Sequence, residues 1–178
     1  MYLFNPITCQ KTSTDYITLE GITGISKGNL SCYKTRKQMI RNLQCYLVED
    51  NATYSELYSF MEKQKPEMEV WKDIEDSTWQ ISSYGRARYM SSKGYRLAIP
   101  QLLMKRLVYI IRQDGKLSTY GVARLVSKYF MKQPRETNLL LLHKDDNRWN
   151  CRVENLEWVS KSYMGKRYGG LANGIPVI

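Results

Sequence analysis

The stretch of sequence that decides the fold is LLLLHKDDN at residues 139–147, followed after two residues by NCRVENLEWVS at residues 150–160. The four leucines predict a buried strand that ends at His143, the single histidine of the chain. The acidic and amide residues that follow are typical of a turn, because such side chains hydrogen-bond the nearby backbone. Leu156 and Trp158 are best explained as core residues. We therefore expect a strand, a polar turn and a packed segment around His143.

Strand-like segments precede this stretch and are separated by turn residues. Lys93-Gly94 and Asp114-Gly115 are good turn dipeptides, and the second leads through a hairpin or similar bend to Leu117. A helix is then predicted over residues 121–130, closing before Pro134. The strand-like segments are residues 79–82, 85–90, 95–99 and 107–111.

The first part of the chain has a different pattern, and a polar segment around Pro66 marks its boundary. Its apolar residues recur at near-helical spacing, interrupted by Gly24 and followed by Ser26, a good N-cap residue. They are Ile17, Leu19, Ile22, Ile25 and Leu30. This predicts a helix, a tight turn and a second helix beginning at Ser26, and a further helix is expected over residues 54–63.

The predicted helix pair resembles the helix-turn-helix of small DNA-binding regulators. Amides and cations on its second helix are residue types that reach base edges and phosphates in a major groove. The residues on that face are Lys27, Asn29, Ser31, Lys34 and Arg36. An ordinary helical pair with a solvated polar face explains the same pattern without any DNA contact.

The second part carries a more specific resemblance. EVWKDI at residues 69–74 and WQISSYGRAR at residues 79–88 are similar to the modular domain that precedes HNH nuclease domains in phage homing endonucleases. HKDDN and NCRVENLEWV closely resemble the HNH signature itself. The resemblance implies a small antiparallel sheet placed against DNA, with Arg86 and Arg88 facing it. The alternative is that both arginines point outward because that sheet face is wet.

The same resemblance places a nuclease site around His143, but without its metal ligands. His143 matches the family's general base and Asn155 its central asparagine, while the two ligand positions correspond to Leu142 and Met164. Neither side chain offers the hard oxygen donor that magnesium or manganese requires, so no metal cofactor is expected unless the protein is an enzyme after all. Asp145 and Asp146 lie in the turn, where acids usually serve the turn itself. His143 is then expected to have a structural role.

The charge of the chain favours a polyanionic partner. Lys and Arg number 27 against 17 Asp and Glu, a net charge of +10, and a basic surface gains by releasing counterions from nucleic acid. A basic balance that only maintains solubility is the alternative. Beyond the helix pair, the expected contacts with double-stranded DNA are Arg86, Arg88, Lys93, Arg96, Lys144 and Arg148.

The remaining features indicate the cellular compartment. The four cysteines are widely spaced without a C-x-x-C pair, which gives a zinc site no local support and fits a reducing compartment. No apolar run approaches the roughly 18 residues of a membrane span. We therefore expect a cytoplasmic protein, in the host-cell cytoplasm if it is phage-encoded, with no membrane partner.

These observations predict an α+β protein with four parts. They are a helical, helix-turn-helix-like domain at residues 1–66, a small β-rich domain at 67–116, a degenerate HNH ββα domain at 117–164 and a basic tail at 165–178. The expected function is DNA binding by an inactive HNH homing endonuclease derivative. The alternatives are an active metal-dependent HNH endonuclease or nickase, and a phage protein-interaction role as an inhibitor of a host nuclease or a virion or ribonucleoprotein component.

Overall fold

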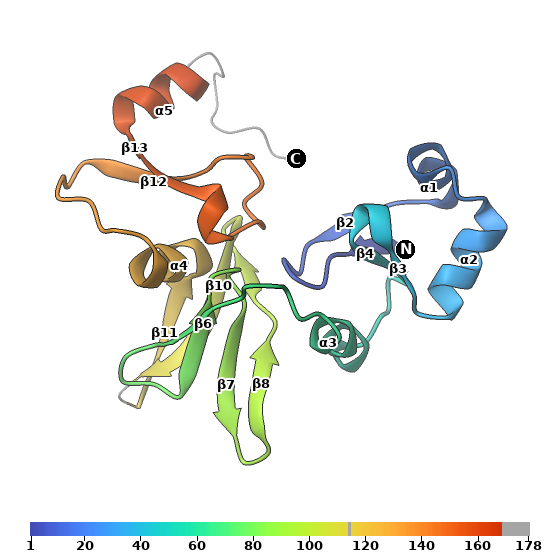
Figure 1. Cartoon of the computed structure of the whole chain (residues 1–178), viewed down its shortest axis with the longest axis horizontal. Coiled ribbons are helices and arrows are strands. Elements are labelled where there is room, and N and C mark those ends of the chain that lie inside the picture. The colour runs from blue at the N-terminus through green and yellow to red at the C-terminus, as the bar shows by residue number, and fades with distance from the viewer. Residues whose placement is uncertain (114, 169–178) are drawn as a thin grey trace. The chain divides into compact units, whose positions relative to one another are not determined.

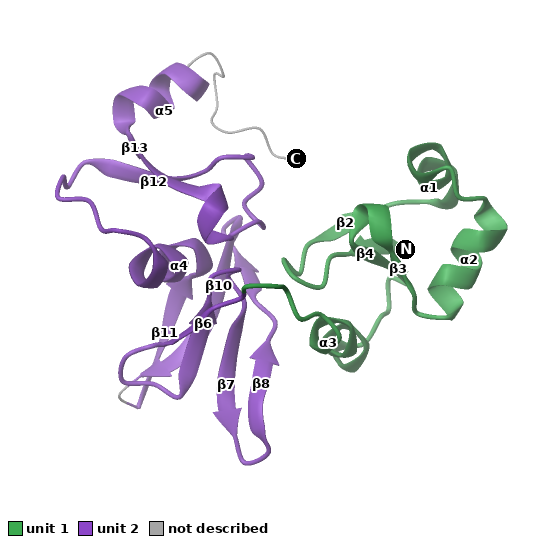
Figure 2. Ribbon diagram, in the orientation of Figure 1, with its two compact units in different colours: residues 1–68 green, residues 69–178 purple. Residues whose placement is uncertain are grey.

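The computed structural model describes residues 1–113 and 115–168, and the chain divides into two compact units (Figure 2). The first is Met1–Met68, and the second begins at Glu69. The division falls close to the expected boundary at Pro66. The second unit is compact as a whole, although two separate domains were expected there. Most of the expected C-terminal tail lies outside the described residues.

The first unit combines three helices with a small antiparallel sheet that the sequence did not predict (Figure 1). The sheet has the order β2-β1-β4-β3. Its strands span only two to four residues, too few to display an alternating pattern in the sequence. The helices are α1 (Tyr16–Thr23), α2 (Lys27–Thr35) and α3 (Tyr54–Glu62), and the strands are β1 (Tyr2–Phe4), β2 (Lys11–Ser13), β3 (Met39–Ile40) and β4 (Cys45–Val48).

Local capping explains where α1 begins and ends. The Asp15 side chain accepts a hydrogen bond from the Thr18 N–H at 2.8 Å, and Gly24 ends the helix with a left-handed φ of 69°. Leu19 and Leu30 are fully buried in a cluster with Ile40 and Leu47. Ile17 and Ile22 of the same helical pattern are instead 85% and 61% exposed.

The second unit contains two small sheets, a hairpin and two helices. One sheet has the order β5-β6-β7-β8 and the other the order β11-β10-β9, and β12 pairs with β13. The strands are β5 (Trp71–Asp73), β6 (Trp79–Ser82), β7 (Ala87–Ser91), β8 (Gly94–Ala98), β9 (Gln101–Leu103), β10 (Arg106–Gln113), β11 (Lys116–Gly121), β12 (Leu139–His143) and β13 (Leu156–Ser160). The helices are α4 (Val122–Phe130) and α5 (Lys161–Tyr168).

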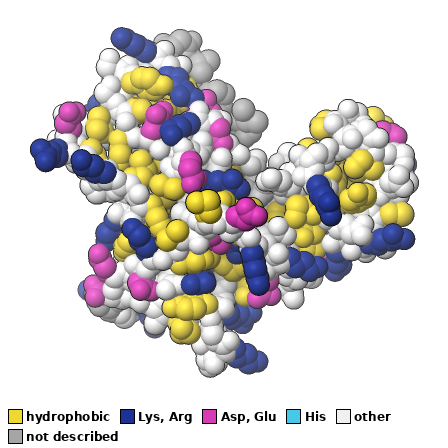
Figure 3. Space-filling model, viewed as in Figure 1, with side chains coloured by type: hydrophobic (Ala, Val, Ile, Leu, Met, Phe, Trp, Pro, Cys, Tyr) yellow, Lys and Arg dark blue, Asp and Glu magenta, His cyan; other side chains and the backbone are white. Residues whose placement is uncertain are grey.

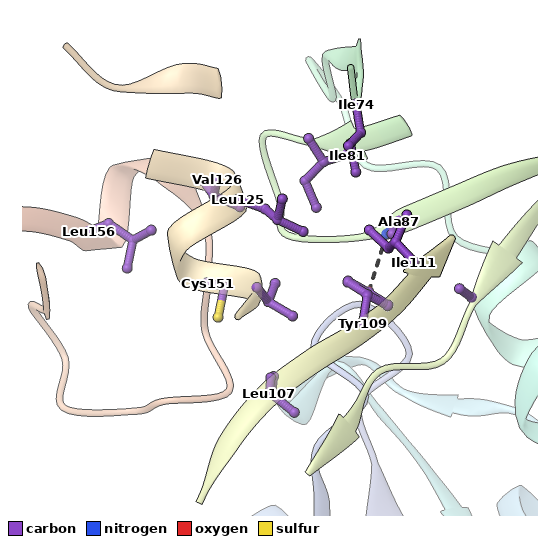
Figure 4. Close-up of a cluster of buried hydrophobic side chains, with 12 residues drawn as sticks. Ile74, Ile81, Ala87, Leu107, Tyr109, Ile111, Leu125, Val126, Cys151 and Leu156 are labelled. Atoms are coloured by element: carbon purple, nitrogen blue, oxygen red, sulfur yellow. Dashed lines mark hydrogen bonds between the residues drawn. The ribbon is translucent and has the colours of Figure 1, made fainter. Parts of the chain in front are cut away.

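Helix α4 lies at the centre of this unit, between the β9–β11 sheet and the β12–β13 hairpin (Figure 1). Its buried residues Val122, Leu125 and Val126 pack in one cluster with residues of both sheets and of the C-terminal hairpin. Figure 4 shows Cys151 and Leu156 in this cluster together with Tyr109 and Ile111 of β10.

The sharing of this core explains why the expected domains at 67–116 and 117–164 form one compact unit. Tyr109 donates a hydrogen bond from its hydroxyl to the Gly85 carbonyl oxygen at 3.2 Å and accepts one from the Ala87 N–H (Figure 4). The Val153 N–H donates to the Ser83 carbonyl oxygen at 2.9 Å. Each small sheet has too little apolar surface to form a core alone, so the two sheets and the hairpin share one core.

No helix in the described parts of the chain has the length and apolar character needed to cross a bilayer.

Candidate functional site

His143 is the last residue of β12, as the sequence predicts, and pairs with Leu156 of β13. The strand itself is less buried than expected, since Leu140 is 39% exposed and only Leu142 is fully in the core. Helix α5 follows β13 directly, so the order of the elements around His143 is strand β12, strand β13 and helix α5.

The His143 side chain faces the buried thiol of Cys151, with 3.7 Å between Nε2 and Sγ. Burial lowers the pKa of His143 below its ordinary value, although the nearby carboxylate of Asp145 opposes this shift. Burial also raises the pKa of Cys151 to about 12, which keeps it a thiol at neutral pH. The pair is therefore neutral, and neither partner is activated as a nucleophile.

The loop after His143 is held by Asn155, the second residue of the predicted site. Its side-chain N–H groups donate to the Asp145 carboxylate at 2.8 Å and to the Asn150 carbonyl oxygen at 2.7 Å. Its Oδ1 accepts the Asp145 backbone N–H at 3.1 Å. Burial pushes the pKa of Asp145 upward, but the hydrogen bonds from Asn150 and Asn155 outweigh it and hold that pKa below its ordinary value.

Asp146, the second acidic residue of the loop, also has hydrogen-bond and ion-pair partners. The Asp146 carboxylate forms an ion pair with Arg167 at 3.0 Å and accepts a hydrogen bond from the Tyr168 hydroxyl. Arg167 also donates to the Lys144 carbonyl oxygen at 2.9 Å. Asp145 and Asp146 therefore hold the loop and its contact with α5.

The donor set around His143 does not fit a hard divalent cation. Leu142 is only 5% exposed, and Met164, the position that the resemblance assigns to the second metal ligand, lies in α5. Within residues 1–113 and 115–168, no group of three or more His, Cys, Asp or Glu side chains is placed to hold a metal ion. Magnesium and manganese bind oxygen donors and gain nothing from a leucine or a thioether.

Two of the arginines expected to contact DNA lie elsewhere than predicted. Arg86 is buried, with its side chain 5% exposed, and forms an ion pair with the buried Glu69 at 3.5 Å. A guanidinium held in this way cannot reach a phosphate, so the prediction of an outward Arg86 is wrong. Arg88 is half-buried between the rings of Trp71 and Tyr95, at 4.1 and 4.3 Å from their centroids.

The other predicted contact residues of this unit are more accessible. Lys93 and Arg96 are exposed on the β7–β8 hairpin. Lys144 is exposed, and its ammonium donates to the Glu154 carbonyl oxygen at 2.7 Å. Arg148 is half-buried in the loop after His143. The structure thus places Lys144 and Arg148 near His143, and Lys93 and Arg96 on a separate hairpin.

In the first unit, the predicted contact face follows α2. Lys27, Asn29, Ser31 and Arg36 are exposed there. Lys34 is not available in the same way, because its ammonium pairs with Glu49 and lies 5.5 Å from the ring centroid of Tyr16. We correct the predicted exposure of Lys34: the pairing holds its side chain against this unit at 23% exposure.

A cluster of positive charge in the second unit was missed. Residues 77–135 contain twelve Lys and Arg against a single acidic residue, Asp114, a net charge of +11 that exceeds that of the whole chain. Counting charge in a moving window would have found it. Eight of these cations are exposed and were not predicted as contacts: Lys105, Arg106, Arg112, Lys116, Arg124, Lys128, Lys132 and Arg135. Figure 3 shows Lys and Arg side chains beside hydrophobic ones on one face of this unit.

Comparison with known proteins adds two findings. Residues 135–166 match a protein-family model described as HNH endonuclease. A solved structure titled "DNA binding and cleavage by the HNH homing endonuclease I-HmuI" is similar to the chain, with 27% sequence identity and a TM-score of 0.50. The similarity covers 59% of this chain and 62% of that one, so it spans less than two thirds of the I-HmuI chain. No curated protein matches the chain.

The geometry and the comparisons agree on the same part of the molecule. The matched segment 135–166 contains β12, β13, the loop held by Asn155 and most of α5. Residues 135–166 therefore match the HNH endonuclease family model, and the chain is structurally similar to an HNH homing endonuclease.

Proposed function

We propose that this protein binds double-stranded DNA and does not cut it, and that it derives from a phage homing endonuclease of the HNH type. One observation carries the proposal: the loop after His143 is kept in place, while the expected metal-binding side chains are missing. Asn155 holds the loop after His143 in the segment that matches the HNH endonuclease model, whereas Leu142 and Met164 occupy the positions that the resemblance assigns to the metal ligands.

The loss of cutting follows from what HNH chemistry requires. Hydrolysis of a phosphodiester in this class needs a divalent metal to stabilise the leaving oxygen and a base to take a proton from water. A neutral His143 could accept a proton, but the described residues contain no group of three or more His, Cys, Asp or Glu side chains placed to hold a metal ion. His143 instead packs on Cys151 and closes the start of the loop.

The retention of DNA binding is supported by charge. Residues 77–135 contain twelve cations and one acidic residue, and apart from Arg86 and Lys128, which pair with Glu69 and Glu75, the exposed ones form a surface that attracts a polyanion. I-HmuI, which is similar to this chain, is itself described as a DNA-binding and DNA-cleaving protein. The exposed face of α2 in the first unit offers further amide and cationic groups that could read bases.

Fluorescence anisotropy with a labelled mixed-sequence duplex, measured over a range of salt concentrations, tests the binding. We expect log K to fall linearly with log[salt], by roughly 0.9 per phosphate contact. The double variant Lys93→Ala/Arg96→Ala should lower that slope by about 2. The double variant Arg41→Ala/Lys65→Ala removes two exposed cations of the first unit and should change it less.

Two outcomes would favour other functions. Nicking of DNA that depends on magnesium or manganese would favour an active endonuclease. A stable protein complex in pull-downs, together with no measurable DNA affinity at low salt, would favour a protein-interaction role.

A further inference from the structure

The β9–β10 hairpin ends in an apolar tip. Its two turn residues, Met104 and Lys105, join Leu103 to its strand partner Arg106. Met104 is 88% exposed, and Leu102 and Leu103 are 56% and 51% exposed. Three consecutive apolar side chains therefore lie in solvent, where isolated exposed residues are ordinary but contiguous ones mark interaction sites.

Strand pairing leaves this tip at an open end of its sheet. The third strand, β11, pairs with β10 only from Val108 to Gln113, so Arg106 and Leu107 have β9 as their single strand partner. Two antiparallel strands joined by a tight turn form a narrow ribbon, a shape that fits a groove of duplex DNA.

The backbone of the tip favours glycine, yet the tip carries long side chains. Met104 and Lys105 have φ values of 46° and 61°, in the left-handed region where residues with a Cβ are disfavoured. Asparagine and glycine are the usual residues of such a turn. The Met104 side chain contributes nothing to the core at 88% exposure, so the fold gives no reason for it to be there.

Charge identifies the partner of this apolar tip. Lys105 and Arg106 follow Met104 and are exposed, and the ion pairs of the described residues involve other cations. No Asp or Glu occurs in β9, β10 or β11. Cations beside apolar side chains fit a partner that carries anionic and apolar groups together, and DNA presents phosphates on either side of stacked, apolar base faces. An anionic membrane surface has the same combination, and the proposed DNA binding favours duplex DNA over it.

We propose that the β9–β10 hairpin enters a groove of duplex DNA and presses Met104 against the bases, with Lys105 and Arg106 on the adjoining phosphates. Apolar wedges of this kind, including methionine, are used by proteins that unstack or bend DNA. This inference rests on the proposed DNA binding and names the element that would make the apolar contact.

The test compares two methionines that are matched in exposure and in backbone conformation. Met68 is 92% exposed and has a φ of 60°, close to the values for Met104. Met104→Gly should weaken binding of a mixed-sequence duplex about tenfold at constant salt. Met68→Gly should leave the affinity unchanged. Neither variant alters charge, so the slope of log K against log[salt] should stay that of the unchanged protein.

Two further variants separate folding and charge from the apolar contact. Glycine relieves the left-handed strain at position 104, so thermal unfolding of Met104→Gly should not occur at a lower temperature. Met104→Gln keeps the side-chain length and should weaken binding as Met104→Gly does. Lys105→Ala/Arg106→Ala should lower the salt slope by about 2.

The outcomes are distinguishable. Equal affinity of Met104→Gly, Met104→Gln and the unchanged protein would overturn the hairpin inference while leaving DNA binding intact. The same equality with an altered sedimentation coefficient would assign the tip to contact between copies of the chain and overturn it too. Failure of the unchanged protein to bind duplex DNA would contradict the proposed function and this inference with it.

Discussion

Asn155 holds Asp145 from two directions: its amide N–H donates to the Asp145 carboxylate at 2.8 Å, and its oxygen accepts the Asp145 backbone N–H at 3.1 Å. A third bond runs to the Asn150 carbonyl oxygen. One side chain therefore closes the polar loop that separates β12 from β13. This arrangement explains how side-chain hydrogen bonds alone can order the loop.

Replacement of Asn155 by Ala should destabilise the protein by about 2 kcal/mol, because three hydrogen bonds are lost and the partly buried Asn150 carbonyl loses its partner. Urea unfolding followed by tryptophan fluorescence measures the change. Asn138→Ala, at an exposed position just before β12, is the control and should change stability by less than about 0.5 kcal/mol. Equal stabilities of the two variants would show that the loop does not depend on Asn155.

Replacement of Arg86 should lower the folding stability of the protein rather than weaken its DNA binding directly. Arg86→Ala leaves the Glu69 carboxylate buried without its ion-pair partner, which costs about 3 kcal/mol or more. The double variant Glu69→Gln/Arg86→Met should recover much of this loss, because no unpaired charge stays buried. Unfolding curves for the unchanged protein, Arg86→Ala and the double variant measure these differences in stability. A stable Arg86→Ala variant with weakened DNA binding would instead place Arg86 at the interface.

The pKa of His143 predicts a loss of stability in mild acid. Burial depresses the pKa below the ordinary value of 6.5, so the unfolded chain takes up a proton first as the pH falls. Stability from the neutral ring is complete above pH 6.5 and is lost as the pH falls through the lower pKa of the folded state. His143→Gln should show a smaller stability difference between pH 7.5 and the acid side. Parallel pH profiles of the two proteins would contradict this account.

The common core of the second unit can be tested at Gly85. An added Cβ there would lie 2.9 Å from the Cβ of Cys151 and 3.2 Å from a Val122 methyl group, at a φ of +78°. Gly94 has a φ of +98° but open space around it, so Gly94→Ala reports the backbone strain alone. Gly85→Ala should therefore destabilise by about 2 kcal/mol more than Gly94→Ala. Equal losses in thermal unfolding would mean that the contact with Cys151 is loose.

Local patterns predicted the elements whose causes are local. The end of β12 at His143 and the tight turn before Gly94 are confirmed, since each depends on neighbouring residues. Helix α4 begins within one residue of the predicted start. The burial of Arg86 could not be predicted in this way, because its partner Glu69 lies on a segment that only the folded sheet brings close.

The first unit shows the limits of periodicity more clearly. Ile17 and Ile22 fit a helical repeat with Leu19, yet only Leu19 is buried, in the cluster with Leu30 of α2. The strands of that sheet are too short to carry a pattern. The helix-turn-helix resemblance correctly placed two helices around Gly24, and its DNA-reading role remains a prediction.

The most direct test of the central claim is a single incubation of supercoiled plasmid with the purified protein and magnesium or manganese, read on one gel for mobility shift and for nicked DNA. We predict a shift that salt abolishes and no conversion to the nicked form, with His143→Ala behaving like the unchanged protein. Metal-dependent nicking that disappears in His143→Ala would contradict the account and show that a working metal site exists despite Leu142 and Met164.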